Sequence, residues 1–144
     1  MAARRLATVR RLVVDASISA AWFLPDEATD ETESVLQATA THDVWVPALW
    51  LLEIANLLPS ARRRKRISAE DRQRLVAAAA SLRIKVDREA VSIMRLDELA
   101  AQYALSAHDA AYLEVALRRR LPLVTRDNAL SVAMTKAGVS SAWA

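Results

Sequence analysis

The sequence of 144 residues contains no cysteine, only two histidines and a single glycine, Gly138. Without cysteine, disulfide frameworks and thiolate metal sites are excluded. The two histidines lack the spacing of metal ligands, so any bound metal ion would have to be held by oxygen atoms. A Gly-rich phosphate loop is also absent, which argues against a nucleotide-binding α/β domain.

The chain also lacks an apolar run of about 18 residues, the length that a membrane-spanning helix requires. Its start, MAARRLATVRRLVV, resembles a signal peptide because it is basic and then apolar. The apolar part before Asp15 is too short for the hydrophobic region of such a peptide. We therefore expect a cytoplasmic protein that does not enter a membrane.

Positive charge is unevenly distributed along the chain. The net charge of +3 is by itself weak evidence for an anionic partner. One cationic run consists of Arg62, Arg63, Arg64, Lys65 and Arg66, and a second of Arg118, Arg119 and Arg120. Such runs are usually solvated helix ends, and the alternative is contact with the phosphates of a nucleic acid.

Short apolar runs alternate with helical patterns. The pattern predicts strands near residues 12–14, 44–46, 84–86 and 121–124, and a very short fifth strand from Val139. Ser17 is expected to cap the first helix. The chain therefore predicts one α/β domain over residues 1–144, with a mostly parallel sheet of about four to five strands covered by helices on both faces. In such sheets, ligands bind beyond the carboxyl ends of the strands.

Two aspartates fall at that edge, because Asp15 follows the first predicted strand and Asp127 the last. Each has a simpler interpretation as a helix N-cap. Glu53 is the only charged residue in the apolar helix at 48–58, and a carboxylate is seldom buried without a partner. A Glu at the edge of the helix that extends into solvent is the alternative.

Asp109 stands three residues after Ser106, as in a capping box. Leu113 and Ala116 nevertheless place it on the apolar stripe of its helix. Asp87, by contrast, lies among basic residues, as do Asp97 and Glu98, and we expect all three to form solvated ion pairs.

Carboxylates gathered at one sheet edge repel one another, by about 4 kcal/mol for each ionised pair at ~4 Å and an effective dielectric near 20. A hard divalent cation, Mg²⁺ or Mn²⁺, would neutralise them and prefers oxygen ligands. A metal ion held in this way serves phosphodiester hydrolysis, because it activates a water and stabilises charge on the phosphate.

Four segments carry these acids in order, VVDAS, LLEIAN, SAHDAAYLEVA and LVTRDNAL. Together they resemble PIN domains, specifically the VapC toxins of bacterial toxin–antitoxin pairs. The resemblance implies a three-layer α/β fold and an Mg²⁺- or Mn²⁺-dependent endoribonuclease that cleaves RNA and inhibits growth. It implies that Asp15, Glu53, Asp109 and Asp127 are the catalytic, metal-binding residues.

The resemblance also implies supporting roles for Ser17 and Thr125, which would orient a carboxylate or a metal-bound water. Asn128 receives only a supporting role, and Ser17 stands where many relatives carry Asn. The family further implies a homodimer and a cognate VapB antitoxin. Two alternatives remain open: a housekeeping RNA-processing PIN nuclease without an antitoxin, and a catalytically inactive PIN-like module that binds RNA or protein.

Overall fold

The structure is a computed structural model that describes residues 4–143. Its centre is a parallel sheet of four strands in the order β3-β2-β1-β4. The strands are β1 (Arg11–Val14), β2 (Asp43–Pro47), β3 (Ile84–Asp87) and β4 (Leu123–Val124). The predicted fifth strand is reduced to an isolated bridge between Leu123 and Ser141.

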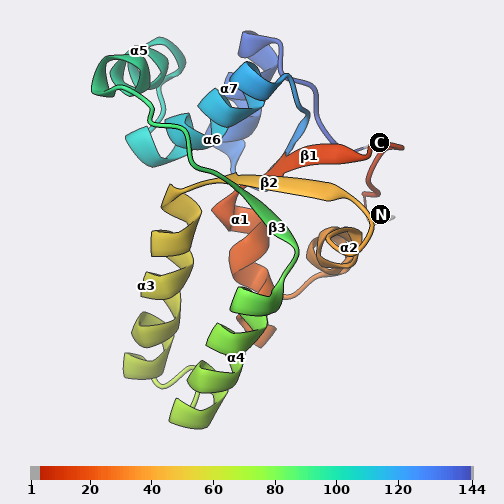
Figure 1. The fold of residues 1–144 in the computed structure, drawn as a ribbon, viewed down its shortest axis with the longest axis vertical. Helices are drawn as coiled ribbons and strands as arrows, with labels where there is room; N and C mark the ends of the chain where they lie inside the picture. Colours follow the sequence, from red (N-terminus) through yellow and green to blue (C-terminus); the bar gives the residue numbers. More distant parts are fainter. Residues whose placement is uncertain (1–3, 144) are drawn as a thin grey trace.

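Helices cover both faces of this sheet. In Figure 1 the upper layer contains α5 (Ile93–Tyr103), α6 (Ala107–Arg119) and α7 (Asn128–Ala137). The lower layer contains α1 (Ala16–Ser19), α2 (Asp30–Ala38), α3 (Leu49–Arg63) and α4 (Ala69–Ser81), with 3₁₀ turns at Ala20–Trp22 and Pro25–Glu27. The predicted three-layer α/β architecture is therefore confirmed. Among residues 4–143, no helix is long and apolar enough to cross a membrane.

The central strand β1 shows why both faces need a covering layer. Val13 belongs to one buried cluster together with Leu113 of α6. Its neighbours Leu12 and Val14 belong to a second cluster with Ile18 of α1. Successive side chains of a strand point to opposite faces, so a strand apolar at every position is buried on both sides. The first polar side chain after this run, at residue 15, emerges at the carboxyl edge.

The first helix begins two residues earlier than the sequence indicates. Ser17 was expected to be its N-cap, and this is wrong, because Ser17 lies inside α1. Asp15 is the N-cap: its backbone is extended and its carboxylate accepts a hydrogen bond from the N–H of Ile18. An Asp caps as well as a Ser, so the pattern alone did not separate the two positions.

Asp87 also differs from expectation, because it is buried rather than solvated, with only 3% of the residue exposed. It ends β3 and faces the last turn of α6. There its carboxylate pairs with Arg118 Nη2 at 2.9 Å and with Arg119 Nε at 2.5 Å. Arg118 in turn pairs with Glu114 at 2.6 Å. Part of the second cationic run is thus neutralised within the fold.

Candidate active site

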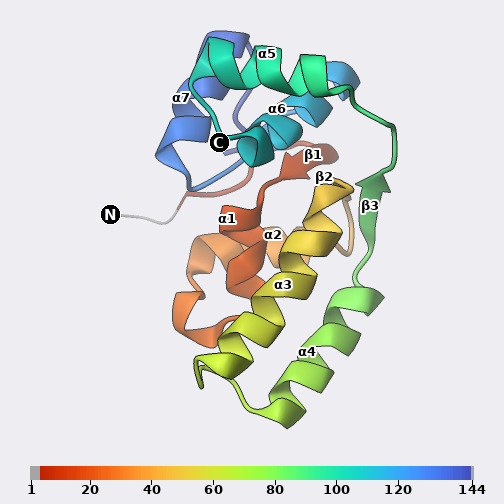
Figure 2. The same ribbon diagram turned by 90° about the vertical axis from the view of Figure 1, so that its left-hand side faces the viewer.

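The four acids predicted from the sequence come from segments that meet at the carboxyl edge of the sheet. Asp15 follows β1, and Asp127 comes three residues after β4, which is paired with β1 in parallel. Glu53 lies on α3, which follows β2, and Asp109 lies in the first turn of α6. Figure 2 looks towards this region, with α1, α3, α6 and α7 around it.

Asp15 is the most deeply buried of the four, with 2% of the residue exposed. Thr125 Oγ1 donates to its Oδ2 at 2.5 Å, and Ser17 Oγ donates to its Oδ1 at 2.7 Å. Burial raises the pKa of Asp15 to about 6, although the hydrogen bonds from Thr125, Ser17 and Ile18 oppose the rise. Above that pH the site holds a buried negative charge.

Asp127 and Asp109 are half-buried and interact electrostatically. Asp127 caps α7, because its Oδ2 accepts from the N–H of Leu130 at 2.8 Å. Burial raises the pKa of Asp109, and the negative charge of Asp127 raises it further. The charge of Asp109 likewise adds to the raised pKa of Asp15. The charge of one neighbouring aspartate therefore disfavours the ionised form of Asp15, and that of another disfavours the ionised form of Asp109.

The capping interpretation is correct for Asp15 and Asp127 as a matter of geometry. At Asp109 half of the expected capping box is present, because Ser106 Oγ caps α6 by accepting the N–H of Asp109 at 3.1 Å, and within residues 4–143 no bond from the N–H of Ser106 to the Asp109 carboxylate completes it. A cap uses only part of the acceptor capacity of a carboxylate. Within residues 4–143, the Oδ1 atom of Asp127 accepts no hydrogen bond. Capping and a role in the site are therefore compatible.

The neighbourhood of Glu53 contains a residue that the sequence analysis missed. The hydroxyl of Tyr112 donates to Glu53 Oε1 at 2.5 Å, and only 1% of Tyr112 is exposed. Burial raises the pKa of Tyr112 well above its usual value near 10, and the hydrogen bond to Glu53 raises it further. Tyr112 follows Asp109 by three positions, and that spacing places two side chains on one helix face. It is the sequence signal that would have identified Tyr112.

The residues expected to support the quartet lie close to Asp15 and Asp127 along the chain: Ser17 in α1, Thr125 two residues before Asp127, and Asn128 at the start of α7. Ser17 and Thr125 both donate to Asp15, and their hydroxyl oxygens are 3.3 Å apart. Arg126 joins the two segments, because its Nε and Nη2 donate to the carbonyl of Ser17 at 3.1 and 2.7 Å. Asn128 is the exposed first residue of α7, and its side chain makes no hydrogen bond within the described part of the chain.

The first cationic run is not part of this cluster. Its five residues are exposed at and after the end of α3. Arg66 is already paired, with Asp26 at 2.8 Å and Glu27 at 3.0 Å. Glu53 and Arg62 are nine residues apart on α3, which corresponds to about 14 Å along the helix axis.

Arginine and lysine are absent from the immediate partners of the four acids, as far as residues 4–143 are concerned. The nearest cationic candidate is the exposed His108, whose Nδ1 lies 4.0 Å from Glu53 Oε2. In the same range, no group of three or more acidic or histidine side chains is arranged so that it could hold a metal ion. The donors are nevertheless all carboxylate oxygens, a set that fits Mg²⁺ or Mn²⁺ in ligand type and charge.

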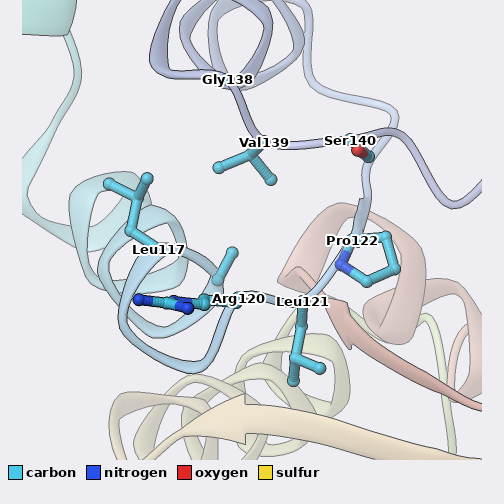
Figure 3. Close-up of a pocket in the computed structure, with 8 residues that line it drawn as sticks. Leu117, Arg120, Leu121, Pro122, Gly138, Val139 and Ser140 are labelled. Carbon is cyan, nitrogen blue, oxygen red and sulfur yellow. The ribbon is translucent and has the colours of Figure 1, made fainter.

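A cavity of about 310 Å³ lies away from these acids (Figure 3). It is formed at the other end of α6 and in the segments before β4 and after α7, and its lining includes Leu117, Arg120, Pro122 and Val139. None of the four acids contributes to it. The candidate chemistry therefore belongs to the sheet edge and not to this cavity.

Known proteins share the fold and the family of this chain. The family model described as PIN domain matches residues 12–134. No curated protein sequence matches the chain. Among solved structures, PAE2754 from Pyrobaculum aerophilum is similar with a TM-score of 0.62 and 21% identity, over 88% of this chain and 87% of that one.

A toxin–antitoxin complex from Klebsiella pneumoniae is similar with a TM-score of 0.54 and 21% identity, over 81% of this chain and 86% of that one. At such identities the two structures support the fold, whereas the family match covers most of the sequence. The chain therefore belongs to the PIN domain family, whose members are typically nucleases that use divalent metal ions.

Proposed function

We propose that the chain is an Mg²⁺- or Mn²⁺-dependent endoribonuclease and the VapC-type toxin of a type II toxin–antitoxin pair. The observation that carries the proposal is the set of four carboxylates at one sheet edge with no arginine or lysine paired to them in the described structure. Uncompensated like charges are costly in a partly buried site. A bound metal cation would offset this cost and would allow the cluster to act on an RNA phosphate.

Asp15, Asp109, Asp127 and Glu53 would hold the ion, which when bound supplies an activated water and neutralises charge on the scissile phosphate. The residues of the chain prepare this arrangement. Thr125 and Ser17 fix the two oxygens of Asp15. Arg126 holds the loop of Asp127 against the loop of Asp15 through the carbonyl of Ser17. Such outer partners orient ligands and are themselves important for affinity.

The cationic run at the end of α3 is proposed to contact RNA phosphates. Arg62, Arg63, Arg64 and Lys65 are exposed, while Arg66 is held by two acids. Because Glu53 and Arg62 share one helix, a strand of RNA along α3 would reach both the acids and the run. Phosphate contacts position RNA without selecting its sequence.

The direct test is cleavage of total RNA by wild type and by Asp15→Asn, each with Mn²⁺ and with a chelator, followed by mapping of the cut ends. Wild type with Mn²⁺ should produce new ends that are missing from the other three reactions. Asp97→Asn, at an exposed position of α5, is the control and should cut like wild type. Equal cutting with chelator and with Mn²⁺ would contradict the proposed mechanism.

The toxin assignment predicts a homodimer and a small antitoxin of the VapB type. Two features support an antitoxin: the fold is similar to a chain of a toxin–antitoxin complex, and an open carboxylate cluster would accept a basic side chain from a partner. Co-expression with the neighbouring small reading frame should give a co-purifying, inactive complex. An active monomer without such a partner would instead indicate the housekeeping nuclease.

A further inference from the structure

The hydrogen-bond donors to the site's carboxylates share one property, which is that they are neutral. Asp15 accepts from two hydroxyls and a backbone N–H, and Asp127 accepts from a backbone N–H. Glu53 accepts from the phenol of Tyr112. A neutral donor orients a carboxylate and leaves its charge available, whereas an arginine would cancel that charge.

We infer that Tyr112 is a positioning residue that fixes the carboxylate of Glu53 through its Oε1 and leaves Oε2 free for the reaction. The inference rests on the proposed function in so far as Glu53 serves a metal ion. Tyr112 does not touch the reacting atoms in this view and acts through Glu53 alone.

Glu53 needs such a partner because its side chain is long and partly exposed. Its side chain is 23% exposed, and its one hydrogen bond within residues 4–143 comes from Tyr112. A free glutamate side chain samples many rotamers, and ordering it costs conformational entropy. A donor that is already rigid reduces the remaining disorder without adding charge.

Tyr112 is suited to this because the core immobilises its ring. The residue is 1% exposed and belongs to the buried cluster that also contains Leu113 and Ile54. It lies one turn after Asp109 on α6, while Glu53 lies on α3. The hydrogen bond therefore ties a carboxylate of one helix to the helix that carries another. Oε2 remains on the side of His108, whose Nδ1 is 4.0 Å away.

The competing explanation is that the hydrogen bond only joins α3 to α6. Tyr112→Phe keeps the ring and removes only the hydroxyl, and the Mn²⁺ affinity of this variant separates the two roles, because a bond that only joins the helices does not orient a metal ligand. Tyr103→Phe is the matched control: this tyrosine on α5 is half-buried, and its hydroxyl accepts a hydrogen bond at 3.2 Å from Gln102. Glu53→Gln, alone and combined with Tyr112→Phe, closes a double-mutant cycle.

Two readouts are measured on each variant. The first, without metal or RNA, is the ¹³C signal of the Glu53 side-chain carboxylate, assigned by its disappearance in Glu53→Gln. The second is the dissociation constant of Mn²⁺ by calorimetry. Tyr112→Phe should shift the Glu53 signal and weaken Mn²⁺ binding about 10-fold to 100-fold, the usual loss for a partner that orients a metal ligand. Tyr103→Phe should change neither, and Tyr112→Phe should add no further loss in Glu53→Gln.

The inference is overturned if the Glu53 signal is unchanged by Tyr112→Phe, or if the loss of Mn²⁺ affinity persists undiminished in the Glu53→Gln background. The first result decides the matter without any metal. The proposed function fails separately, if wild type neither binds Mn²⁺ nor cuts RNA while the Glu53 signal still responds to Tyr112→Phe. In that case Tyr112 positions Glu53 for another purpose.

Discussion

Two buried aspartates at the carboxyl ends of strands have pKa values that are shifted in opposite directions. Asp15 follows β1 and Asp87 ends β3, and the two residues are 2% and 3% exposed. Burial raises the pKa of Asp15 to about 6. Burial acts in the same direction on Asp87, but hydrogen bonds from Arg118 and Arg119 overcome it and lower the pKa to about 2.

The donors to the two carboxylates differ in charge. Asp87 receives two guanidinium groups, and one of them, Arg119, also stacks on the ring of Trp45 at 3.6 Å. Among the described residues, Asp15 receives only hydroxyls and a backbone N–H. The fold can thus neutralise a buried carboxylate with arginine and does so at Asp87. The charge left uncompensated at Asp15 is available to an external cation.

The largest effect that distinguishes the two regions should be on RNA cleavage. Asp15→Asn and Asp127→Asn keep their helix caps, because Asn caps about as well as Asp. Each should lower the cleavage rate by a factor of about 100 to 1,000 or more, as expected when a preorganised charge is removed. Asp87→Asn should leave the rate per folded molecule nearly unchanged.

The same variants should differ in their response to Mn²⁺. Wild type should melt at a higher temperature with Mn²⁺, and that gain should shrink in Asp15→Asn, because weaker binding to the folded state gives less stabilisation. The metal mechanism would be refuted by two results together. The melting temperature of wild type would be the same with and without Mn²⁺, and Asp15→Asn would cut RNA at the wild-type rate.

The next largest effect should be on stability, in the ion-pair network of Asp87. Asp87→Asn leaves Arg118 and Arg119 without their shared carboxylate and should lower the free energy of unfolding by about 3 kcal/mol, the low end for a broken buried pair. The low end applies because the side chains of both arginines are about a quarter exposed, at 28% and 26%. Urea titration measures this, with Asp97→Asn as a control that should change little. An Asp87→Asn variant as stable as wild type would show that this ion-pair network is energetically neutral.

The sequence predicted the sheet edge and its acids because strand ends and apolar stripes are local patterns. Asp15 and Asp127 follow apolar runs, and each is followed by a helical pattern. Asp87 carries the same strand-end signal, yet its burial depends on Arg118 and Arg119, which are more than 30 positions away. The hydrogen bond from Tyr112 to Glu53 depends on tertiary packing in the same way, because it joins α6 to α3. Local patterns place side chains at an edge, and the choice of partner there is a property of tertiary packing.

A fourth prediction concerns the pH dependence of stability, and its sign differs between the two aspartates. The pKa of Asp15 is raised in the folded state, from 3.8 to about 6, so the protonated form favours folding. The stability contributed by Asp15 is full below about pH 4 and is lost as the pH rises through 6, by a total of about 3 kcal/mol. The pKa of Asp87 is lowered, so its contribution is present above pH 3.8 and is lost as the pH falls towards 2.

Asp15→Asn isolates the first of these contributions. The free energy of unfolding of wild type relative to Asp15→Asn should fall between pH 4 and 7 in metal-free buffer, with most of the change between the unfolded pKa of 3.8 and the folded pKa of about 6. Saturating Mn²⁺ should oppose the fall, because the ion favours the ionised carboxylate. A difference that stays flat with pH would mean that Asp15 titrates normally and that its hydroxyl donors offset its burial.

The smallest expected effect tests whether the exposed cationic run differs from the arginines that are already paired. Replacing Arg63 and Arg64 with Gln removes two exposed charges at the end of α3. If both contact RNA phosphates, the slope of log K against log salt should decrease by about 1.4, since each contact to a single strand contributes about 0.7.

Equal loss of charge elsewhere provides the control. Arg120→Gln with Lys136→Gln removes two exposed charges at the ends of α6 and α7 that are remote from Asp109 and Asp127. This pair should leave the slope unchanged, because counterions are released only where phosphates bind. Binding of a non-cleavable single strand to the Asp15→Asn protein supplies the measurement without loss of substrate. If both pairs of substitutions change the slope equally, the run acts only through net charge. If neither does, the end of α3 is a solvated helix end and RNA reaches the acids by another path.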